Sequence, residues 1–125
     1  MNHVQITDIY TVDTSELKAE IDSKDKQGMT ALMKASMIGN CGILAKLLKF
    51  GADPRAQNFF GMSALMIACV KQHSSAVKLL LKAKANVNEI DHDGFTPLQR
   101  ACRYNTTSEI VQILFDNGAI LDPRK

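Results

Sequence analysis

The stretch DHDGFTPLQRAC, residues 91–102, has two earlier copies in this chain of 125 residues. Residues 25–36 read DKQGMTALMKAS, and residues 58–69 read NFFGMSALMIAC. The three copies share a glycine at the same place, and these glycines are equally spaced along the chain: Gly28, Gly61 and Gly94. The interval between them is the period of the sequence, and a fixed period of this length is typical of repeat architectures, in which each unit buries its apolar side against its neighbour. The place of a residue within the repeat therefore predicts its structural role.

The overall composition narrows the class of protein. Apolar residues make up 46% of the chain and charged residues 22%, which is typical of a folded, water-soluble domain. The net charge of +2 is too small to indicate nucleic acid or an anionic membrane surface as the partner. No apolar run is long enough to cross a bilayer, and residues 1–10 do not resemble a signal peptide, so we expect no membrane insertion.

The cysteines indicate a reducing compartment rather than a disulfide framework. There are three of them, and Cys69 and Cys102 hold the same place in successive repeats, so we expect both to be small core residues of a helix. The odd number, and the lack of Cys-x-x-Cys or His-x-x-x-His spacing, argue against disulfides and against a zinc site. We expect an intracellular protein, located in the cytoplasm, with the nucleus left open.

Each repeat predicts a turn followed by two short helices. In the first repeat Gly28 is free to take a positive φ in the turn, and Thr30 stands where a helix N-cap belongs. We expect a first helix over residues 31–37 and a second over residues 42–49. Gly51 follows the second helix, as glycine commonly does at a helix C-terminus.

The later repeats follow this layout with a few local differences. Pro97 suits the first turn of a helix, where its missing N–H costs no hydrogen bond. Lys84 stands at the place that Gly51 and Gly118 occupy, so we expect a non-glycine residue with positive φ there. The buried face of the last helix is expected to consist of Ile110, Val111, Ile113 and Leu114.

The period also divides the chain into units. We expect three repeats, at residues 25–57, 58–90 and 91–125. Residues 1–24 contain no full repeat, and we interpret them as an N-terminal capping segment or a degenerate half-repeat, with a short helix over residues 13–21. A more polar terminal unit is what a repeat array needs at its exposed end.

The repeated motif resembles the ankyrin repeat. That motif runs Gly-x-Thr-(Pro/Ala)-Leu-x-x-Ala, continues with a Leu-Leu pair and closes with Gly-Ala-x-Val-Asn. Residues 94–101, GFTPLQRA, give the best single match, residues 51–53 and 85–88 match the end of the repeat, and the resemblance covers residues 25–122. It implies an all-α ankyrin-repeat solenoid, built from helix-turn-helix units with projecting hairpin-like loops.

The chain departs from the family pattern at several places. Alanine replaces the usual proline at positions 31 and 64, and Met33, Met66 and Gln99 replace the usual histidine. The resemblance would otherwise imply a hydrogen bond between the threonine and that histidine, and we expect this bond to be absent. These changes suggest a less stable array, but they leave the expected fold unchanged.

The resemblance implies a protein-binding module with no chemistry of its own. In this family the loop tips and the first helix of each pair line a concave side that contacts the partner. Residues at those places in this chain are more apolar than solvent-facing loops require, and a contiguous exposed apolar patch usually marks an interaction site. The partner-binding residues that we expect are Met29, Met37, Phe59, Phe60, Met62, Val70, Ile90, His92, Asp93, Phe95, Arg103 and Tyr104.

The two neighbouring phenylalanines at the centre of the array have an alternative role. Because successive loops stack on one another, we expect either Phe59 or Phe60 to cover the adjacent loop, which leaves the other ring for a partner. Met29 and Met62 hold equivalent places, and loop stacking is an alternative role for each of them as well.

No motif indicates catalysis. His3, His73 and His92 are scattered, and none has a serine, cysteine or aspartate at the spacing of a catalytic triad. The glycine motifs of nucleotide-binding sites are absent, so we expect no enzyme activity, no cofactor and no bound metal. We expect a monomer that binds another protein. Two alternatives stay open: self-association through the apolar patch, and a regulatory or scaffolding role within a larger enzyme or channel.

Overall fold

The computed structural model describes residues 20–104 and 108–121. Within these ranges it contains α-helices and no strand: α2 (Ala31–Ile38), α3 (Cys41–Lys49), α4 (Ala64–Val70), α5 (Ser74–Lys82), α6 (Pro97–Arg103) and α7 (Ser108–Asp116). The expectation of an all-α repeat fold is confirmed. The helix expected over residues 13–21 lies almost entirely outside the described residues.

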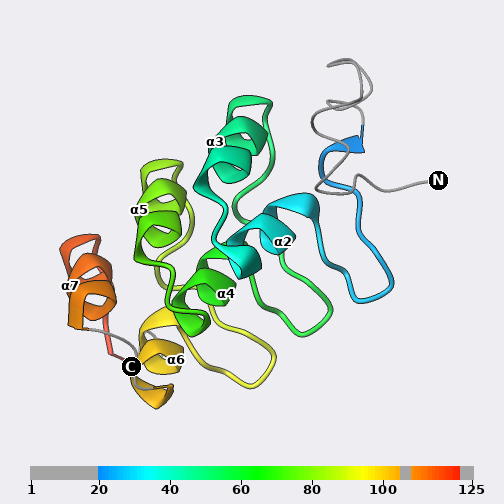
Figure 1. Cartoon of the computed structure of the whole chain (residues 1–125). Helices are drawn as coiled ribbons and strands as arrows, with labels where there is room; N and C mark the ends of the chain where they lie inside the picture. The colour runs from blue at the N-terminus through cyan, green and yellow to red at the C-terminus, as the bar shows by residue number, and fades with distance from the viewer. Residues whose placement is uncertain (1–19, 105–107, 122–125) are drawn as a thin grey trace.

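The helices form three stacked pairs. α2 packs on α3, α4 on α5, and α6 on α7. Along the stack α4 contacts both α2 and α6 in one row, while α5 contacts both α3 and α7 in a second row. Figure 1 shows the two rows and the long loops that join the pairs, which project beyond the row of α2, α4 and α6. The repeat in the sequence therefore corresponds to a repeat of helix pairs, and we keep 25–57, 58–90 and 91–125 as proposed limits.

The first helix of each pair begins at a hydroxyl residue, as the motif predicts. The N-caps, each accepting a hydrogen bond from the backbone N–H three residues later, are Thr30, Ser63 and Thr96. The Gln99 side-chain oxygen accepts in return from the Thr96 N–H at 3.0 Å, and the Met33 sulfur accepts from the Thr30 N–H at 3.4 Å. In α2 and α6 the residue that replaces histidine therefore completes a reciprocal cap.

Two non-glycine residues adopt positive φ at places where another repeat has glycine. Lys84, at φ 73°, confirms the expectation from its alignment with Gly51 and Gly118. Gln72, at φ 64°, stands one period after Gly39, which has φ 82°. This conformation costs an L-residue roughly 1–2 kcal/mol, so the central repeat contains two strained turns.

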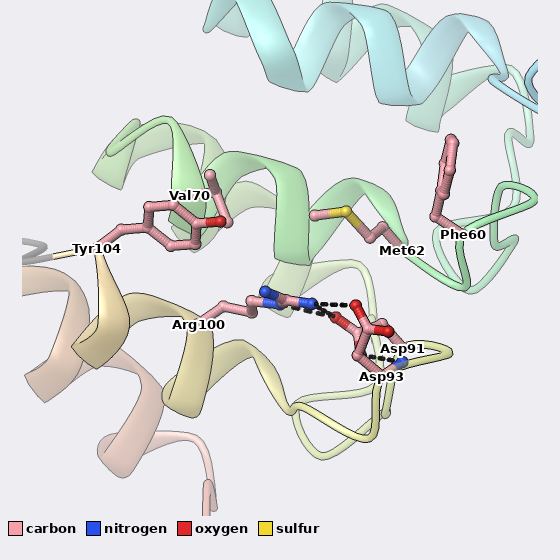
Figure 2. Close-up of a pocket in the computed structure, with 7 residues that line it drawn as sticks. All are labelled: Phe60, Met62, Val70, Asp91, Asp93, Arg100 and Tyr104. Atoms are coloured by element: carbon pink, nitrogen blue, oxygen red, sulfur yellow. Dashed lines mark hydrogen bonds and ion pairs between the residues drawn. The ribbon is translucent and has the colours of Figure 1, made fainter.

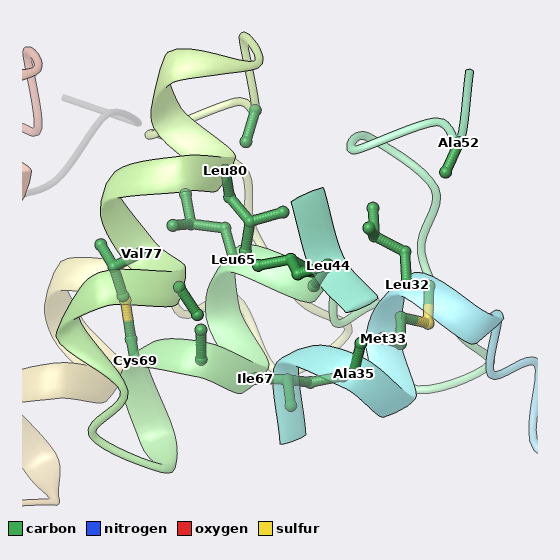
Figure 3. Close-up of a cluster of buried hydrophobic side chains, with 14 of the residues drawn as sticks. Leu32, Met33, Ala35, Leu44, Ala52, Leu65, Ile67, Cys69, Val77 and Leu80 are labelled. Carbon is green, nitrogen blue, oxygen red and sulfur yellow. The ribbon is translucent and has the colours of Figure 1, made fainter. Parts of the chain in front are cut away.

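The core lies between the helix pairs and is built from leucines at equivalent places. Each row of helices contributes a set that is no more than 1% exposed, namely Leu32, Leu65 and Leu98 in one row and Leu47, Leu80 and Leu114 in the other. Figure 3 shows Leu44, Leu65 and Leu80 pointing toward one another between the first two pairs. A core that repeats along the stack needs no single centre, because each pair is covered by the next.

The last described pair differs from the expected burial. Cys69 is fully buried, as predicted, but Cys102 is exposed, so the prediction that both are core residues is wrong for Cys102. Val111 and Ile113 are only half-buried, whereas Ile110 and Leu114 are fully buried. For Cys102 and Val111 the physical reason is that the equivalent residues of α4 and α5 are covered by the following pair, whereas the described part of the chain has no helix pair beyond α6 and α7.

A buried carboxylate near the end of the second unit contacts the start of α4. Glu89 is 7% exposed and accepts a hydrogen bond from the hydroxyl of Ser63, the N-cap of α4. One repeat earlier the same place holds Ala56. Burial raises the pKa of Glu89 to about 7, with a further contribution from the charge of Asp91, while Ser63 and Arg55 act in the opposite direction.

We expect the free energy of unfolding to fall as the pH rises through the range in which Glu89 ionises. A carboxyl whose pKa is higher in the folded chain stabilises it while protonated; this contribution is complete below the ordinary value of 4.5 and is lost as the pH rises through about 7. The loss is about 2–4 kcal/mol at ~1.4 kcal/mol per pH unit. Glu89→Gln keeps an oxygen for Ser63 but cannot ionise, so its stability should stay level. Urea unfolding on either side of this range checks the difference, and an equal fall in both proteins contradicts it.

Candidate functional site

The turn before each first helix is held by one side-chain oxygen. Oδ1 of Asp91 accepts hydrogen bonds from the N–H groups of Asp93 and Phe95, both at 3.0 Å. Asn58 accepts in the same way from the second and fourth residues after it, at 2.9 and 3.0 Å, and Asp25 does so at 2.9 Å for both. The three turns therefore share one backbone conformation, and they differ in the side chains that they present.

Successive turns are joined by a backbone hydrogen bond and by a ring packed on a glycine. The N–H of Phe59 donates to the carbonyl of Gln27 at 3.1 Å, and a Cβ on Gly28 would lie 2.8 Å from the Phe59 ring. His92 packs in the same way on Gly61 one turn later. Phe59 is therefore the ring that covers the adjacent loop, although it remains 60% exposed.

A cavity of about 360 Å³ opens between the second and third units. We call it the mixed pocket, and its lining residues are Phe60, Met62, Val70, Asp91, Asp93, Arg100 and Tyr104. Figure 2 shows Met62 and Val70 on the α4 side facing Arg100 on α6, with Phe60 at one end and Tyr104 at the other. One wall is therefore apolar and the other charged.

Arg100 organises the charged wall. Its guanidinium lies 2.6 Å from an Asp91 carboxylate oxygen and 3.2 Å from one of Asp93, and its carbon lies 4.5 Å from the centre of the Phe95 ring. Burial alone would raise the pKa of Asp91, but hydrogen bonds from the Phe95 N–H and from Arg100 hold that pKa below its usual value. Asp91 therefore stays ionised, and it holds Arg100 in place along this wall.

A second cavity of about 170 Å³ adjoins the first. We call it the apolar pocket, and it is lined by Met29, Met37, Asn58, Met62, Ile67, Val70 and Lys71. Met62 and Val70 line both cavities, so the two pockets lie next to each other. The apolar pocket contains no acidic side chain, and Lys71 is its sole charged lining residue.

The structure brings most of the expected partner-binding residues to these two pockets. Those that line one or both are Met29, Met37, Phe60, Met62, Val70, Asp93 and Tyr104. Phe59 and His92 pack on the preceding turn, and the Arg103 guanidinium carbon lies 5.3 Å from the centre of the Phe95 ring. Ile90 is 42% exposed and lines neither pocket.

Met29 does not stand exposed at the loop tip, and its contact with the next turn agrees with the loop-stacking alternative. Met29 is only 7% exposed, and its sulfur accepts a hydrogen bond from the Asn58 amide at 3.4 Å. Asn58, which makes this contact, belongs to the following turn. Met29 contributes to the floor of the apolar pocket rather than to the loop tip.

Several pocket residues were not among the expected partner-binding residues. They are Asn58, Ile67, Lys71, Asp91 and Arg100. A signal was available, because positions one period apart can be compared along the chain, and at these places the central repeat differs from the outer two.

Two further findings concern other kinds of site. No helix in the described part of the chain is long and apolar enough to cross a membrane. Within residues 20–104 and 108–121, no three or more His, Cys, Asp or Glu side chains are grouped so that they could hold a metal ion.

Stacked helix pairs that follow the period of the sequence, and pockets between the loops and the first helices, define a helical repeat protein. The family model described as ankyrin repeats, three copies, matches residues 32–125. The chain therefore belongs to the ankyrin-repeat family, and the resemblance stated from the sequence is confirmed. Ankyrin repeats are generally protein–protein interaction modules, and the family is generally non-enzymatic.

The curated relatives that the chain matches are longer proteins. It is 35% identical over 98 residues to human SH3 and multiple ankyrin repeat domains protein 2, which covers 78% of this chain and 5% of that protein. It is 30% identical over 112 residues to the tyrosine-protein kinase HTK16 of Hydra vulgaris, and the match covers 88% of this chain and 15% of that protein. It is 38% identical over 65 residues to the DNA replication inhibitor plutonium of Drosophila melanogaster, and the match covers 52% of this chain and 37% of that protein. The chain thus spans well under half the length of each.

Proposed function

We propose that this chain binds another protein through the two-pocket surface, which we define as the residues lining the mixed pocket and the apolar pocket. The observation that supports this most is that the two cavities adjoin each other, with Met62 and Val70 lining both. Phe60 stands at one end of the mixed pocket and is 63% exposed. Methionine and aromatic residues are enriched at the cores of protein interfaces, and contiguous exposed apolar surface usually marks one.

The turns that carry this surface support the proposal because they are fixed before binding. Asn58 and Asp91 each accept two backbone hydrogen bonds within their own turn. The N–H of His92 also donates to the carbonyl of Phe60 at 3.1 Å, which joins the two turns. A preorganised surface loses little conformational entropy on association, so more of the contact energy remains as affinity.

We also propose that the module has no catalytic activity and acts as a monomer inside the cell. The general absence of enzyme activity in the family supports the first point. The location inside the cell is supported by the three cysteines, which are all free. Self-association through the two-pocket surface is the alternative to a monomer, and sedimentation at two concentrations distinguishes them.

A second candidate function is a regulatory or scaffolding segment of a larger polypeptide. The observation that favours it is the length of the relatives, one of which is a tyrosine-protein kinase and another a protein with an SH3 domain in its name. In that case the two-pocket surface would contact a neighbouring domain of the same chain. The sequence of the complete reading frame distinguishes this candidate from a free-standing adaptor.

We expect Phe60→Glu to remove the captured partner while leaving the fold intact. The ring is 63% exposed, so little core packing is lost, but a carboxylate would be placed at the edge of an apolar surface that a partner must desolvate. Capture from a lysate of cells that express the protein, quantified by mass spectrometry, should show a loss of about tenfold or more for the specific partner.

The matched control for this variant is Phe115→Glu. Phe115 is 46% exposed on α7, in the other row of helices, and lines neither pocket. The Phe115→Glu substitution introduces the same charge as Phe60→Glu and removes a ring of the same size. Capture that is equal for wild type and Phe60→Glu, or that is lost only with Phe115→Glu, would place the binding surface elsewhere.

A further inference from the structure

The two outer units share an ion pair at the loop side of their first helix. In the first unit Lys34 Nζ lies 3.2 Å from an Asp25 carboxylate oxygen. In the third unit the Arg100 guanidinium lies 2.6 Å from an Asp91 carboxylate oxygen. In both cases the acid opens the turn and the base lies nine residues later on the helix. The ion pair therefore places charged groups between the turn and the first helix.

The central unit replaces both partners of this ion pair by uncharged residues. Asn58 stands one period after Asp25, and Ile67 stands one period after Lys34. Asn58 keeps the backbone hydrogen bonds of the turn, so the loop conformation is preserved without the charge. Ile67 and Asn58 both line the apolar pocket. The pocket therefore lies where the outer units have a salt bridge.

The size and lining of the apolar pocket suit a single large side chain. Its volume is about 170 Å³, comparable with an apolar protein cavity of ~150 Å³ that holds a benzene ring. Three of its walls are the methionines Met29, Met37 and Met62, whose side chains are flexible enough to close around either a branched aliphatic chain or a ring. Buried anchors of this kind carry much of the affinity of protein interfaces.

The charges around the apolar pocket favour an acidic residue on the partner. Lys34 and Arg100, at the equivalent places of the two outer units, are already paired with carboxylates of their own units. Lys71 lines the pocket itself, is exposed, and forms no ion pair within residues 20–104 and 108–121. An incoming carboxylate would therefore find an unpaired ammonium group beside the anchor site.

We propose that the apolar pocket takes one large aliphatic or aromatic side chain from a peptide segment of the partner, and that an acidic residue beside this anchor pairs with Lys71. This inference rests on the proposed function, and it adds the chemistry of the partner. Lysine or arginine in place of the acid would be repelled by Lys71.

The probe for this inference is a phage-displayed library of random dodecapeptides, selected on the immobilised full chain. We expect the enriched peptides to share a large apolar residue within a few positions of Asp or Glu. Synthetic copies should shift the ¹³C-methyl resonances of the pocket methionines, Met29, Met37 and Met62. Met33 and Met66 are at most 1% exposed in the core and serve as internal references that should not move.

Two variants test the two halves of the inference. Asn58→Asp combined with Ile67→Lys installs in the central unit the ion pair that the outer units carry, so the fold should persist while the pocket is filled and becomes charged. We expect it to weaken the selected peptides by about tenfold or more. Lys71→Glu should weaken acidic peptides by about tenfold and favour their lysine-substituted copies. Lys82→Glu, on α5 in the other row, makes the same change of charge away from the pocket and should have no effect.

The outcomes separate this inference from the proposed function. Enrichment without acidic residues, peptides that keep their affinity for the Asn58→Asp/Ile67→Lys variant, or a library that yields no binder would each overturn the inference. If a protein partner is nevertheless lost with Phe60→Glu and kept with Phe115→Glu, the proposed function stands and only the anchor-and-acid chemistry falls. If the partner is insensitive to Phe60→Glu as well, both fall.

Discussion

Gly61→Ala is expected to lower the free energy of unfolding by about 2–4 kcal/mol, which combines backbone strain with overpacking. Gly61 has φ +81°, and a Cβ there would lie 2.6 Å from the backbone nitrogen of His92. That nitrogen cannot move aside without loss of its hydrogen bond to the Phe60 carbonyl, which joins the second and third turns. The substitution therefore disrupts the stacking of the loops as well as one turn.

Gly51→Ala is the matched control for this prediction. Gly51 has φ +96°, but a Cβ added there would have no neighbouring atom within 4 Å. Only the cost of the left-handed conformation applies, and we expect a loss of about 1 kcal/mol. Urea unfolding followed by circular dichroism compares the two variants. If they lose the same stability, the close contact between successive turns is not what constrains Gly61.

Asp91→Ala is expected to destabilise the chain by about 3–5 kcal/mol, because it leaves a largely buried arginine without its main partner. The Asp91 side chain is 1% exposed and that of Arg100 13%. The same substitution removes the acceptor for the N–H groups of Asp93 and Phe95, so the third turn loses its internal hydrogen bonds. Asp93, at 3.2 Å from Arg100 and 77% exposed, replaces only part of the lost charge.

Asp91→Asn separates the two contributions, since it reproduces the asparagine found at position 58. The amide oxygen can still accept from the turn, so only the charge is lost, and we expect a smaller effect of about 1–3 kcal/mol. The pH dependence gives a second check. The pKa of Asp91 is lowered in the folded chain, so its stabilisation is present above the ordinary value of 3.8 and is lost as the pH falls through the lowered pKa. Wild type should therefore lose more stability than Asp91→Ala on acidification below that value; a parallel loss would contradict the role of the ion pair.

The helices and turns of the fold could be predicted from the sequence because each local sequence signal occurs in every repeat. Thr30, Ser63 and Thr96 fixed the helix starts, and they are N-caps in the structure. Even an unusual feature such as the positive φ of Lys84 followed from alignment with glycines in the other repeats. Local propensity, period and turn chemistry all agreed, and this agreement is what makes a fold predictable.

The candidate site was harder to predict because the direction in which a loop side chain points depends on its contacts with the next repeat. Phe59 and Phe60 have the same chemistry, but Phe59 packs on Gly28 and its N–H donates to Gln27, whereas Phe60 lines the mixed pocket. Met29 was expected at the surface, but the amide of Asn58 lies against it. Such contacts join residues about one repeat apart, and a pattern within one repeat does not contain them.

The apolar pocket shows what comparison of repeats can add. The motif emphasises positions that stay the same, and these build the stack. The pocket arises from positions that change, where Asp25 with Lys34 gives way to Asn58 with Ile67. A comparison of charge at equivalent places along the chain would have found the missing ion pair before the structure was known.

Site-specific photocrosslinking tests most directly the proposal that the two-pocket surface binds a protein partner. Benzoylphenylalanine in place of Phe60 puts an aromatic crosslinker at the end of the mixed pocket, and the same residue in place of Phe115 puts one on the other row of helices. Irradiation in cells that express the protein should give a covalent protein adduct from position 60 and none from position 115. An adduct from position 115 alone, or none from either position, would contradict the proposed binding surface.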